Sequence, residues 1–390
     1  MRDEMKKVPR LRFRGFQEDW ELCKLGDLGS VAMNKRIFKE QTSESGDIPF
    51  YKIGTFGATA DAFISRELFE TYKKKYPYPK IGDLLISASG SIGRVVEYKG
   101  NDEYFQDSNI VWLKHDDRIN NLFLKQFYSI VKWHGLEGST IKRLYNKNIL
   151  ETTIHLPVFD EQEKIGTLFK QLDDTITLHQ RKLDQLKELK KAYLQLMFVP
   201  SNTKNNKVPK LRFANFEENW ELCKLENIIE KQIKGKAKVE NLCNGSVEYL
   251  DANRLNGGKP IYTKALPDVS KRDIIILWDG SKAGKVYYGF KGVLGSTLKA
   301  YQLKECANSQ FIYQQLLDNQ NNIYNNYRTP NIPHVVKNFS SIFPIWMTSF
   351  EEQSQMADIL SNLDNRIILQ QNLTDTMISL KKSYLQNMFI

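Results

Sequence analysis

Three charged side chains in the first half of the sequence have types and a spacing that could cleave a phosphodiester bond. Asp83, Glu97 and Lys99 loosely match the Asp…Glu-x-Lys pattern of metal-dependent nucleases. In such sites the carboxylates hold Mg²⁺ and the lysine orients the attacking water. The second half has Asp273 but carries Gly289 at the glutamate position. Because the pattern is short, a nuclease stays only an alternative hypothesis.

Nucleotide-binding and methyl-transfer motifs are incomplete. The segment LNGGKPIY (255–262) has Pro260 where a phosphate-binding loop needs Ser or Thr. The segment SGSIGRV (89–95) has two glycines and no acidic residue placed for a ribose, so it does not make a dinucleotide fingerprint. The segment NIPH (331–334) does not match the Pro-Pro-aromatic loop with which DNA amino-methyltransferases grip a flipped base. We therefore expect no cofactor on this chain.

Metal-binding and hydrolase motifs are also missing, because HExxH, GxSxG and CxxC do not occur. The cysteines are scattered, at Cys23, Cys223, Cys243 and Cys306. This spacing predicts neither a zinc site nor a disulfide framework. No run of 18 apolar residues occurs, so we expect no transmembrane helix, and the opening residues do not resemble a signal peptide. A reducing cytoplasm is the expected location.

The composition permits nucleic-acid binding. The chain has 390 residues, enough for two or three domains, with 41% hydrophobic and 26% charged residues, as in soluble globular proteins. Its 56 Lys and Arg exceed its 46 Asp and Glu, which gives a net charge of +10. Basic side chains neutralise phosphates, and the 18 Tyr and 21 Phe can pack or stack. A merely basic soluble protein would have the same composition.

The sequence contains an internal repeat. VPRLRFRGFQEDWELCKL (8–25) recurs as VPKLRFANFEENWELCKL (208–225), with thirteen of eighteen positions identical. Residues 159–198 recur at 350–389, an offset of 191. We therefore expect two copies of one module. The expected organisation is a first globular domain, a helical spacer, a linker, a second globular domain and a second helical spacer, at 1–158, 159–199, 200–206, 207–346 and 347–390.

Each helical stretch shows apolar residues at alternating spacings of four and three, which predicts a coiled-coil seam. In the first copy the seam positions are Ile165, Phe169, Leu172, Ile176, His179, Leu183, Leu186, Lys190, Tyr193 and Met197. In the second copy they are Met356, Leu360, Leu363, Ile367, Gln370, Thr374, Met377, Lys381, Tyr384 and Met388. Matching positions suggest that the two helices pack on each other, each roughly 55 Å long. Asp160 with Glu163, and Ser349 with Glu352, have capping-box spacing.

The stretches between these repeats, about 26–155 and 226–342, predict mixed α/β domains. DLLISAS (83–89) and DIIILWD (273–279) are β-branched apolar runs typical of strands, and each precedes a glycine–serine turn. Further strands are expected in SNIVWLKH and STLKAYQLKE, and helices in LFLKQFYSIVKW and SQFIYQQLLD. The expected fold class is α+β, with two similar mixed domains, each followed by a long helix, and the helices packed as an antiparallel coiled coil.

Two loops in each half have small polar and basic side chains suited to phosphates and base edges: the glycine–serine turn and the segment before the long helix. The first-half candidates are Ser89, Ser91, Arg94, Ser139, Thr140, Lys142, Arg143, Asn146 and Lys147. The second-half candidates are Ser281, Lys282, Lys285, Tyr327, Arg328, Thr329 and Asn331. The alternative is an ordinary hairpin turn and a basic loop with solvated charges.

Taken together, LRFRGFQEDWELCKL, GDLLISASGSIGRV, GSTIKRLYNKNILETTIHLPVFDEQEKIG and LKKAYLQLMF resemble the specificity subunit of type I restriction–modification enzymes. The resemblance spans nearly the whole chain, although RTPNIPHVV (328–336) matches its counterpart poorly. It implies a non-catalytic subunit whose two target-recognition domains bind the two parts of a split, asymmetric double-stranded DNA site.

The resemblance also implies partners. Two methyltransferase subunits would use S-adenosylmethionine, and two restriction–translocase subunits using ATP and Mg²⁺ would be able to join. A regulatory or architectural DNA-binding protein with the same duplicated layout is the remaining alternative, beside the nuclease.

Overall fold

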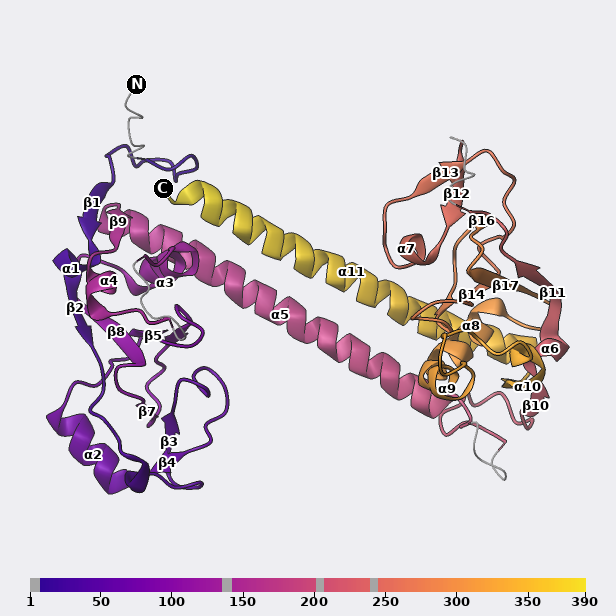
Figure 1. The fold of residues 1–390 in the computed structure, drawn as a ribbon, viewed down its shortest axis with the longest axis horizontal. Coiled ribbons are helices and arrows are strands. Elements are labelled where there is room, and N and C mark those ends of the chain that lie inside the picture. Colours follow the sequence, from indigo (N-terminus) through magenta and orange to yellow (C-terminus); the bar gives the residue numbers. More distant parts are fainter. Residues whose placement is uncertain (1–7, 135–141, 201–206, 239–244) are drawn as a thin grey trace. The chain divides into compact units, whose positions relative to one another are not determined.

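The computed structural model describes residues 8–134, 142–200, 207–238 and 245–390 (Figure 1). The chain divides into two compact units, which we describe separately. Unit 1 comprises Met1–His179 and Leu373–Ile390, and unit 2 comprises Gln180–Asn372. Each long helix begins in one unit and ends in the other.

Unit 1 is built around a four-stranded antiparallel sheet in the order β2-β8-β5-β6 (Figure 1). A three-stranded sheet, β4-β3-β7, and a two-stranded ribbon, β1-β9, complete it. The strands are β1 (Glu21–Lys24), β2 (Gly29–Ala32), β3 (Ile48–Tyr51), β4 (Phe63–Ile64), β5 (Leu84–Ser87), β6 (Val95–Glu97), β7 (Tyr104–Phe105), β8 (Ile110–His115) and β9 (Thr153–Leu156). The helices are α1 (Leu25–Leu28), α2 (Arg66–Lys75), α3 (Asn121–Ile130), α4 (Asn146–Leu150) and α5 (Phe159–Met197), with a 3₁₀ turn at Lys39–Gln41.

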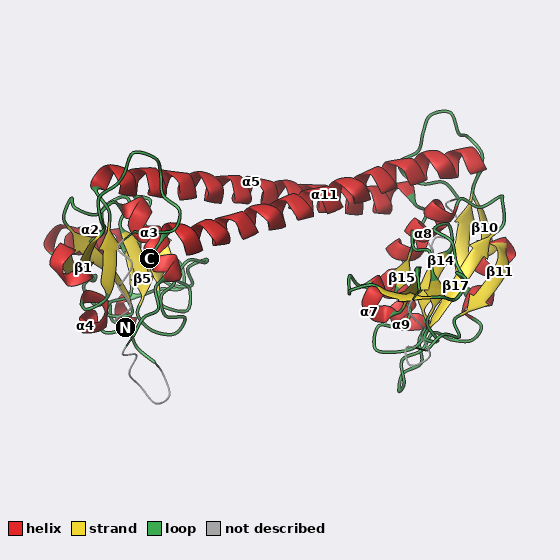
Figure 2. Cartoon of the chain, turned by 90° about the horizontal axis from the view of Figure 1, so that it is seen from above, coloured by secondary structure: helices red, strands yellow, loops and turns green. Residues whose placement is uncertain are grey.

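Unit 2 repeats the three sheets, with the orders β11-β17-β14-β15, β13-β12-β16 and β10-β18. Strands β11, β17, β14 and β15 are visible in Figure 2. Its strands are β10 (Glu221–Lys224), β11 (Ile229–Lys234), β12 (Val247–Leu250), β13 (Ile261–Thr263), β14 (Ile274–Leu277), β15 (Val286–Tyr287), β16 (Val293–Leu294), β17 (Leu298–Leu303) and β18 (Pro344–Met347). Its helices are α6 (Leu225–Ile228), α7 (Ala252–Leu255), α8 (Ser309–Asp318), α9 (Gln320–Asn326), α10 (Phe339–Ile342) and α11 (Phe350–Met388). The mixed α and β architecture predicted from the sequence is confirmed.

The predicted strands and helices form because their local sequence signals are strong. All four residues of β5 and of β14 are buried, as continuous apolar runs demand. The helices α3 and α8 each begin after an asparagine, whose side chain accepts hydrogen bonds from the next turn's backbone amides. Asn120 and Asn308 are these capping residues.

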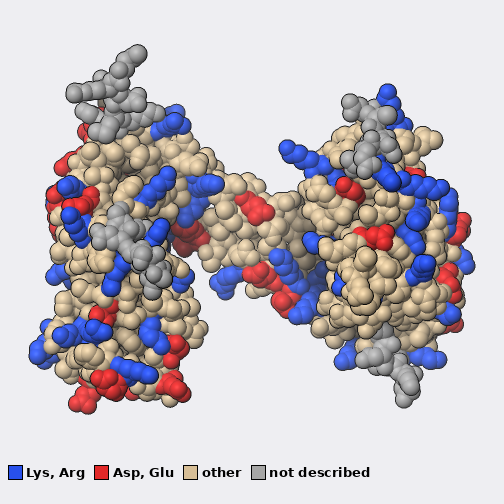
Figure 3. Space-filling view, in the orientation of Figure 1, with Lys and Arg blue, Asp and Glu red and all other residues tan. Residues whose placement is uncertain are grey.

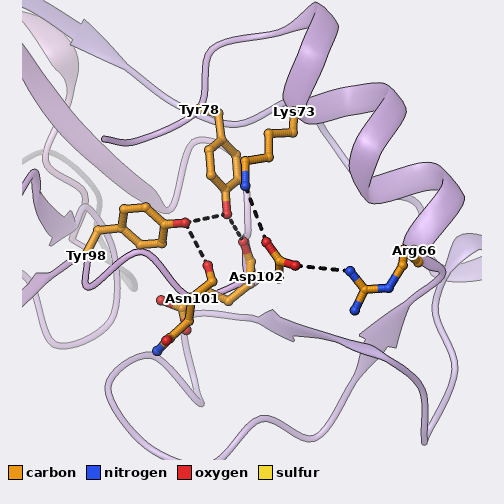
Figure 4. Close-up of polar contacts among 7 residues, drawn as sticks. Arg66, Lys73, Tyr78, Tyr98, Asn101 and Asp102 are labelled. Carbon is orange, nitrogen blue, oxygen red and sulfur yellow. Dashed lines mark hydrogen bonds and ion pairs between the residues drawn. The ribbon is translucent and has the colours of Figure 1, made fainter. Parts of the chain in front are cut away.

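Helix α2 distinguishes the two units, since residues 264–273 at the corresponding place in unit 2 form no helix. The Arg66 and Lys73 side chains reach the Asp102 carboxylate at 3.0 and 3.4 Å (Figure 4). The Tyr78 hydroxyl donates to the Glu103 carbonyl at 2.6 Å, and burial raises the pKa of Tyr78. The Tyr98 hydroxyl lies 3.1 Å from that of Tyr78 (Figure 4). These contacts hold the insertion against the loop before β7.

The repeated opening segment packs on the start of a long helix in each unit. Arg12 donates from Nε and Nη2 to the two carboxylate oxygens of Glu161, at 2.7 and 2.9 Å. The indole of Trp20 donates to the same carboxylate at 3.2 Å, and Glu161 is fully buried. Unit 2 repeats the three distances with Arg212, Glu352 and Trp220. The tryptophan of each opening segment is thus buried against the start of a long helix.

The capping-box prediction holds in part for α11 and is wrong for α5. Before α11, the Ser349 hydroxyl accepts from the Glu352 amide at 3.3 Å. The Glu352 carboxylate turns to Arg212 instead of closing the box. Asp160 lies inside α5, whose first amides bond to the Val158 carbonyl. At the offset of 191, Val158 corresponds to Ser349, so no side-chain oxygen stands at that position.

Within each unit, the beginning of one long helix lies beside the end of the other (Figures 1 and 2). In unit 1, Phe169 near the start of α5 shares a buried cluster with Met388 at the end of α11. In unit 2, Met197 shares a cluster with Leu360. The helices therefore run antiparallel in each unit. Each of the twenty seam positions is buried or half-buried. No helix among the described residues is both long and apolar enough to cross a membrane.

Candidate nucleic-acid interface

The glycine–serine turn after the central strand is tightly built in both units. In unit 1, Gly93 has φ +83° and donates its amide to the Ser87 carbonyl. A Cβ atom at Gly93 would lie 2.7 Å from the Trp133 indole nitrogen. In unit 2, Gly284 has φ +92°, and a Cβ atom there would lie 2.8 Å from Ile323. Only glycine fits both the left-handed backbone and the space.

The structure brings the two candidate loops of each half together. In unit 1 the Leu144 amide donates to the Ala88 carbonyl at 2.8 Å. The backbones of Ser89 and Arg143 form an isolated antiparallel β-bridge. We call residues 88–94 with 142–147 junction 1.

In unit 2 the Val335 amide donates to the Trp278 carbonyl at 2.9 Å. The backbones of Asp279 and His334 form an isolated antiparallel β-bridge. We call residues 278–285 with 327–335 junction 2. The same backbone contact thus occurs at the same place in both units.

In junction 1, several candidate side chains support the loop. The Ser89 side chain is buried and donates to Asn109 at 2.8 Å. Arg143 donates to the Ser108 carbonyl at 2.9 Å, and Arg94 to the Phe56 carbonyl at 2.7 Å.

The remaining candidates of junction 1 are exposed. The exposed residues are Ser91, Lys142, Asn146 and Lys147, and Lys147 lies 3.9 Å from Glu151. Ser139 and Thr140 lie outside the described residues. Among the described residues, Lys142 is therefore the exposed lysine of junction 1 that forms no ion pair.

In junction 2, the candidates Tyr327 and Arg328 make contacts within the protein. The Tyr327 ring packs against Phe339 and Phe343, and burial raises the pKa of Tyr327. Arg328 donates to the Tyr324 carbonyl at 2.8 Å and to the Ser281 carbonyl at 3.3 Å. These residues shape the junction.

Other junction 2 candidates differ in exposure. The Thr329 hydroxyl donates to the Ile332 carbonyl at 2.5 Å. Ser281, Lys282 and Asn331 are exposed. Lys285 is half-buried and donates to Asn256 at 2.5 Å.

The sequence interpretation missed a third segment at each junction, the loop after β3 or β12. In unit 1 the Phe56 carbonyl accepts a hydrogen bond from Arg94. In unit 2 the Asn256 side-chain oxygen accepts one from Lys285. Both residues follow the central strand of a three-stranded sheet. Their equivalent positions in the two repeats were the sequence signal that could have identified this segment.

Basic side chains are spread over the visible faces of both units, with acidic ones among them (Figure 3). The nuclease candidates are engaged in other contacts. Glu97 accepts from Lys99 at 2.6 Å and from Lys125 at 3.0 Å. Burial opposes ionisation, but these two lysines outweigh it and lower the pKa of Glu97. Asp83 accepts from the Lys80 amide at 2.7 Å. Within the described ranges, no group of three or more His, Cys, Asp or Glu could hold a metal ion.

The chain matches several known proteins in sequence. It is 50% identical over 181 residues to a protein named as a type I restriction enzyme specificity subunit from Haemophilus influenzae, covering 45% of this chain and 47% of that protein. It is 31% identical over 181 residues to the MjaVIII type I specificity subunit of Methanocaldococcus jannaschii, covering 44% and 42%. The chain thus spans less than half the length of these relatives.

Solved structures share the fold across nearly the whole chain. A type I restriction-modification S subunit from M. genitalium superposes with a TM-score of 0.70 at 17% identity, covering 98% of this chain and 99% of that one. A chain from a type I complex described for assembly and conformational transition gives a TM-score of 0.51 at 12% identity, covering 96% and 98%. The family model for the type I restriction modification DNA specificity domain matches residues 17–188 and 217–377. Since these ranges cover most of the sequence and fall one in each repeat, the chain belongs to the family of type I restriction–modification DNA specificity proteins.

Proposed function

We propose that this chain is the DNA-specificity subunit of a type I restriction–modification complex, with each unit recognising one part of a split, asymmetric site. The observation that carries the proposal is that one backbone junction occurs twice with different side chains. The Leu144–Ala88 contact of junction 1 recurs as Val335–Trp278 in junction 2. One framework that presents two different surfaces suits a DNA site made of two different parts.

The exposed groups at the junctions have the chemistry that DNA contact requires. Lys142 and Lys282 offer charged donors for phosphate oxygens. Asn146 and Asn331 offer paired donor and acceptor atoms suited to adenine edges. Arg143 and Arg328 hold the loops through backbone carbonyls, so we assign them a positioning role.

The long helices supply a surface for protein partners. Leu178 and Leu189 of α5 are 63% and 41% exposed, and at the offset of 191 they correspond to Leu369 and Leu380 of α11, at 68% and 39%. Apolar side chains repeated on an outer helix face suit docking of another helix. We propose that two methyltransferase subunits dock here, one per repeat, and that restriction–translocase subunits join them.

The chain itself is proposed to be non-catalytic and to act in the cytoplasm. Its partners would use S-adenosylmethionine, ATP and Mg²⁺. Purified chain should therefore neither methylate nor cut DNA with any of these added. Metal-dependent cleavage that disappears in Glu97→Ala would instead support the nuclease alternative.

Methylome sequencing of cells with and without the gene tests the proposal. The expected result is a split motif methylated only when the gene is present. Exchanging residues 278–285 and 327–335 for those of another family member should change one part of the motif alone. Loss of gene regulation with no change in methylation would favour a regulatory or architectural protein.

A further inference from the structure

The second unit carries a pair of lysines next to junction 2 that no sequence motif singled out. We propose that Lys234 and Lys299 together bind one backbone phosphate of the DNA that unit 2 recognises. This inference rests on the proposed function, because it names a contact within that function.

The sheet places these two like charges side by side. Strands β11 and β17 pair antiparallel, and their register sets Lys234 directly opposite Lys299. Residues opposite each other on neighbouring strands point to the same face, and like charges there destabilise the sheet. Neither lysine forms an ion pair with a carboxylate among the residues that the structure describes. A bound anion would remove this repulsion.

The Lys299 side chain is held in place by Trp278. Its ammonium nitrogen lies 3.3 Å from the Trp278 ring centroid, a cation–π contact, and the residue is half-buried. Burial and then the charge of Lys234 lower the pKa of Lys299, while Asp279 opposes them. Burial and Lys234 thus disfavour the charge of Lys299, and a bound anion would offset both effects.

The position of the pair connects it to junction 2. The carbonyl of Trp278 accepts the Val335 amide that holds the two loops together. The next residue, Asp279, forms a backbone β-bridge with His334. A phosphate held at Lys299 would thus lie beside the loops that we assign to base recognition, as expected for a contact that sets the orientation of the duplex.

The lysine pair is a property of unit 2 and not of the shared framework. In the equivalent sheets, Lys299 pairs with Ile276 of the central strand, whereas Val111 pairs with Ile86. Val111 is 1% exposed and belongs to the core of unit 1. A charge that the framework does not need, placed directly opposite a second lysine, indicates a role in binding.

Equilibrium binding of the full chain to a duplex that carries its site tests the pair. Lys299→Met keeps the apolar stem over Trp278 and removes the charge, and Lys234→Met does the same on β11. Each change should weaken binding, and loss of one phosphate contact should reduce the slope of log affinity against log salt by about 0.9. The methylated motif should stay the same, because a phosphate contact carries no direct sequence information.

Two matched variants serve as controls. Lys304 follows the opposite end of β17 and donates to the Asn227 carbonyl, so Lys304→Met removes a charge away from the junction and should leave the slope unchanged. Lys299→Arg keeps the charge and should bind nearly as the wild type does. Circular dichroism melting of each variant separates lost binding from lost folding.

Amine acetylation with mass spectrometry gives an independent readout on the wild-type chain. The duplex should protect Lys234 and Lys299 from acetylation, and inorganic phosphate at the same phosphate concentration should not. An unchanged salt slope in both Met variants would overturn the phosphate site and leave the proposed function standing. Protection of Lys234 and Lys299 from acetylation by inorganic phosphate alone would also overturn the phosphate site. A wild-type chain that binds its site no more tightly than other duplexes would contradict the proposed function itself.

Discussion

The ammonium group of Lys190 lies 2.5 Å from a carboxylate oxygen of Asp364, and Lys381 makes the same contact with Asp173 at 2.6 Å. Both the lysines and the aspartates are related by the offset of 191, and each pair lies within one unit. The Gln314 amide also donates to Asp364 at 2.7 Å. Each pair joins the end of one long helix to the first half of the other, so the two pairs specify an antiparallel register twice.

Breaking one of these pairs should destabilise one unit. Lys190→Met leaves the Asp364 carboxylate without its cation in a site where the two side chains are only 11% and 30% exposed. We expect a loss of about 1–3 kcal/mol in the free energy of unfolding. Urea denaturation measures it, with Lys191→Met as the control, since Lys191 is exposed and 4.0 Å from Glu188. An equal loss in the control would contradict a specific role for the pair.

The buried carboxylate at the start of α5 should matter more. Glu161→Gln removes the charge that Arg12 and Trp20 contact and leaves the guanidinium without a partner. We expect a loss of about 3–5 kcal/mol, as for other broken buried ion pairs. Glu352→Gln is the matched change in unit 2. Hydrogen exchange should show early opening of unit 1 in the first variant and of unit 2 in the second. The same unit opening in both variants would rule out independent roles.

The two junctions should act on different parts of the DNA site. Lys142→Ala is expected to weaken contacts of one half-site, and Lys282→Ala those of the other, because each lysine belongs to a single junction. Each lost phosphate contact lowers the salt slope by about 0.9. Footprinting of the bound duplex locates the change. If Lys142→Ala disturbs both half-sites equally, the assignment of one unit to each half-site is wrong.

The long helices should set the spacing between the half-sites. Four added residues are near one helical turn and lengthen a helix by about 6 Å, or one to two base pairs. Insertion near Leu183 in α5 must be matched near Thr374 in α11, because each unit has its own Lys–Asp pair. The doubly lengthened chain should keep both half-sites and lengthen the unspecified spacer, which methylome sequencing would report.

The single insertion is the control for this prediction. It shifts one helix against the other, so we expect one ion pair to break and activity to fall. An active double insertion with altered half-sites and an unchanged spacer would show that the helices do not set the distance.

The sequence by itself determined the duplicated organisation, the central strands and the seam of the helices. Two nearly identical opening segments require two similar modules, and the buried runs of β5 and β14 are encoded by adjacent residues. The seam from Ile165 to Met197 is a local period of the helix, so it needs no knowledge of the partner.

Only the tertiary structure decided which residues meet. Ala88 and Leu144 are far apart in sequence, and their contact depends on the whole sheet between them. Likewise Glu161, and not Asp160 with Glu163, proved to be the key acidic residue of the first helix, because its partner Arg12 lies 149 positions away. The opposition of Lys234 and Lys299 follows from strand register in the same way. Local spacing fixes the period and the face of an element, but register between distant strands is set by the packing of the complete core.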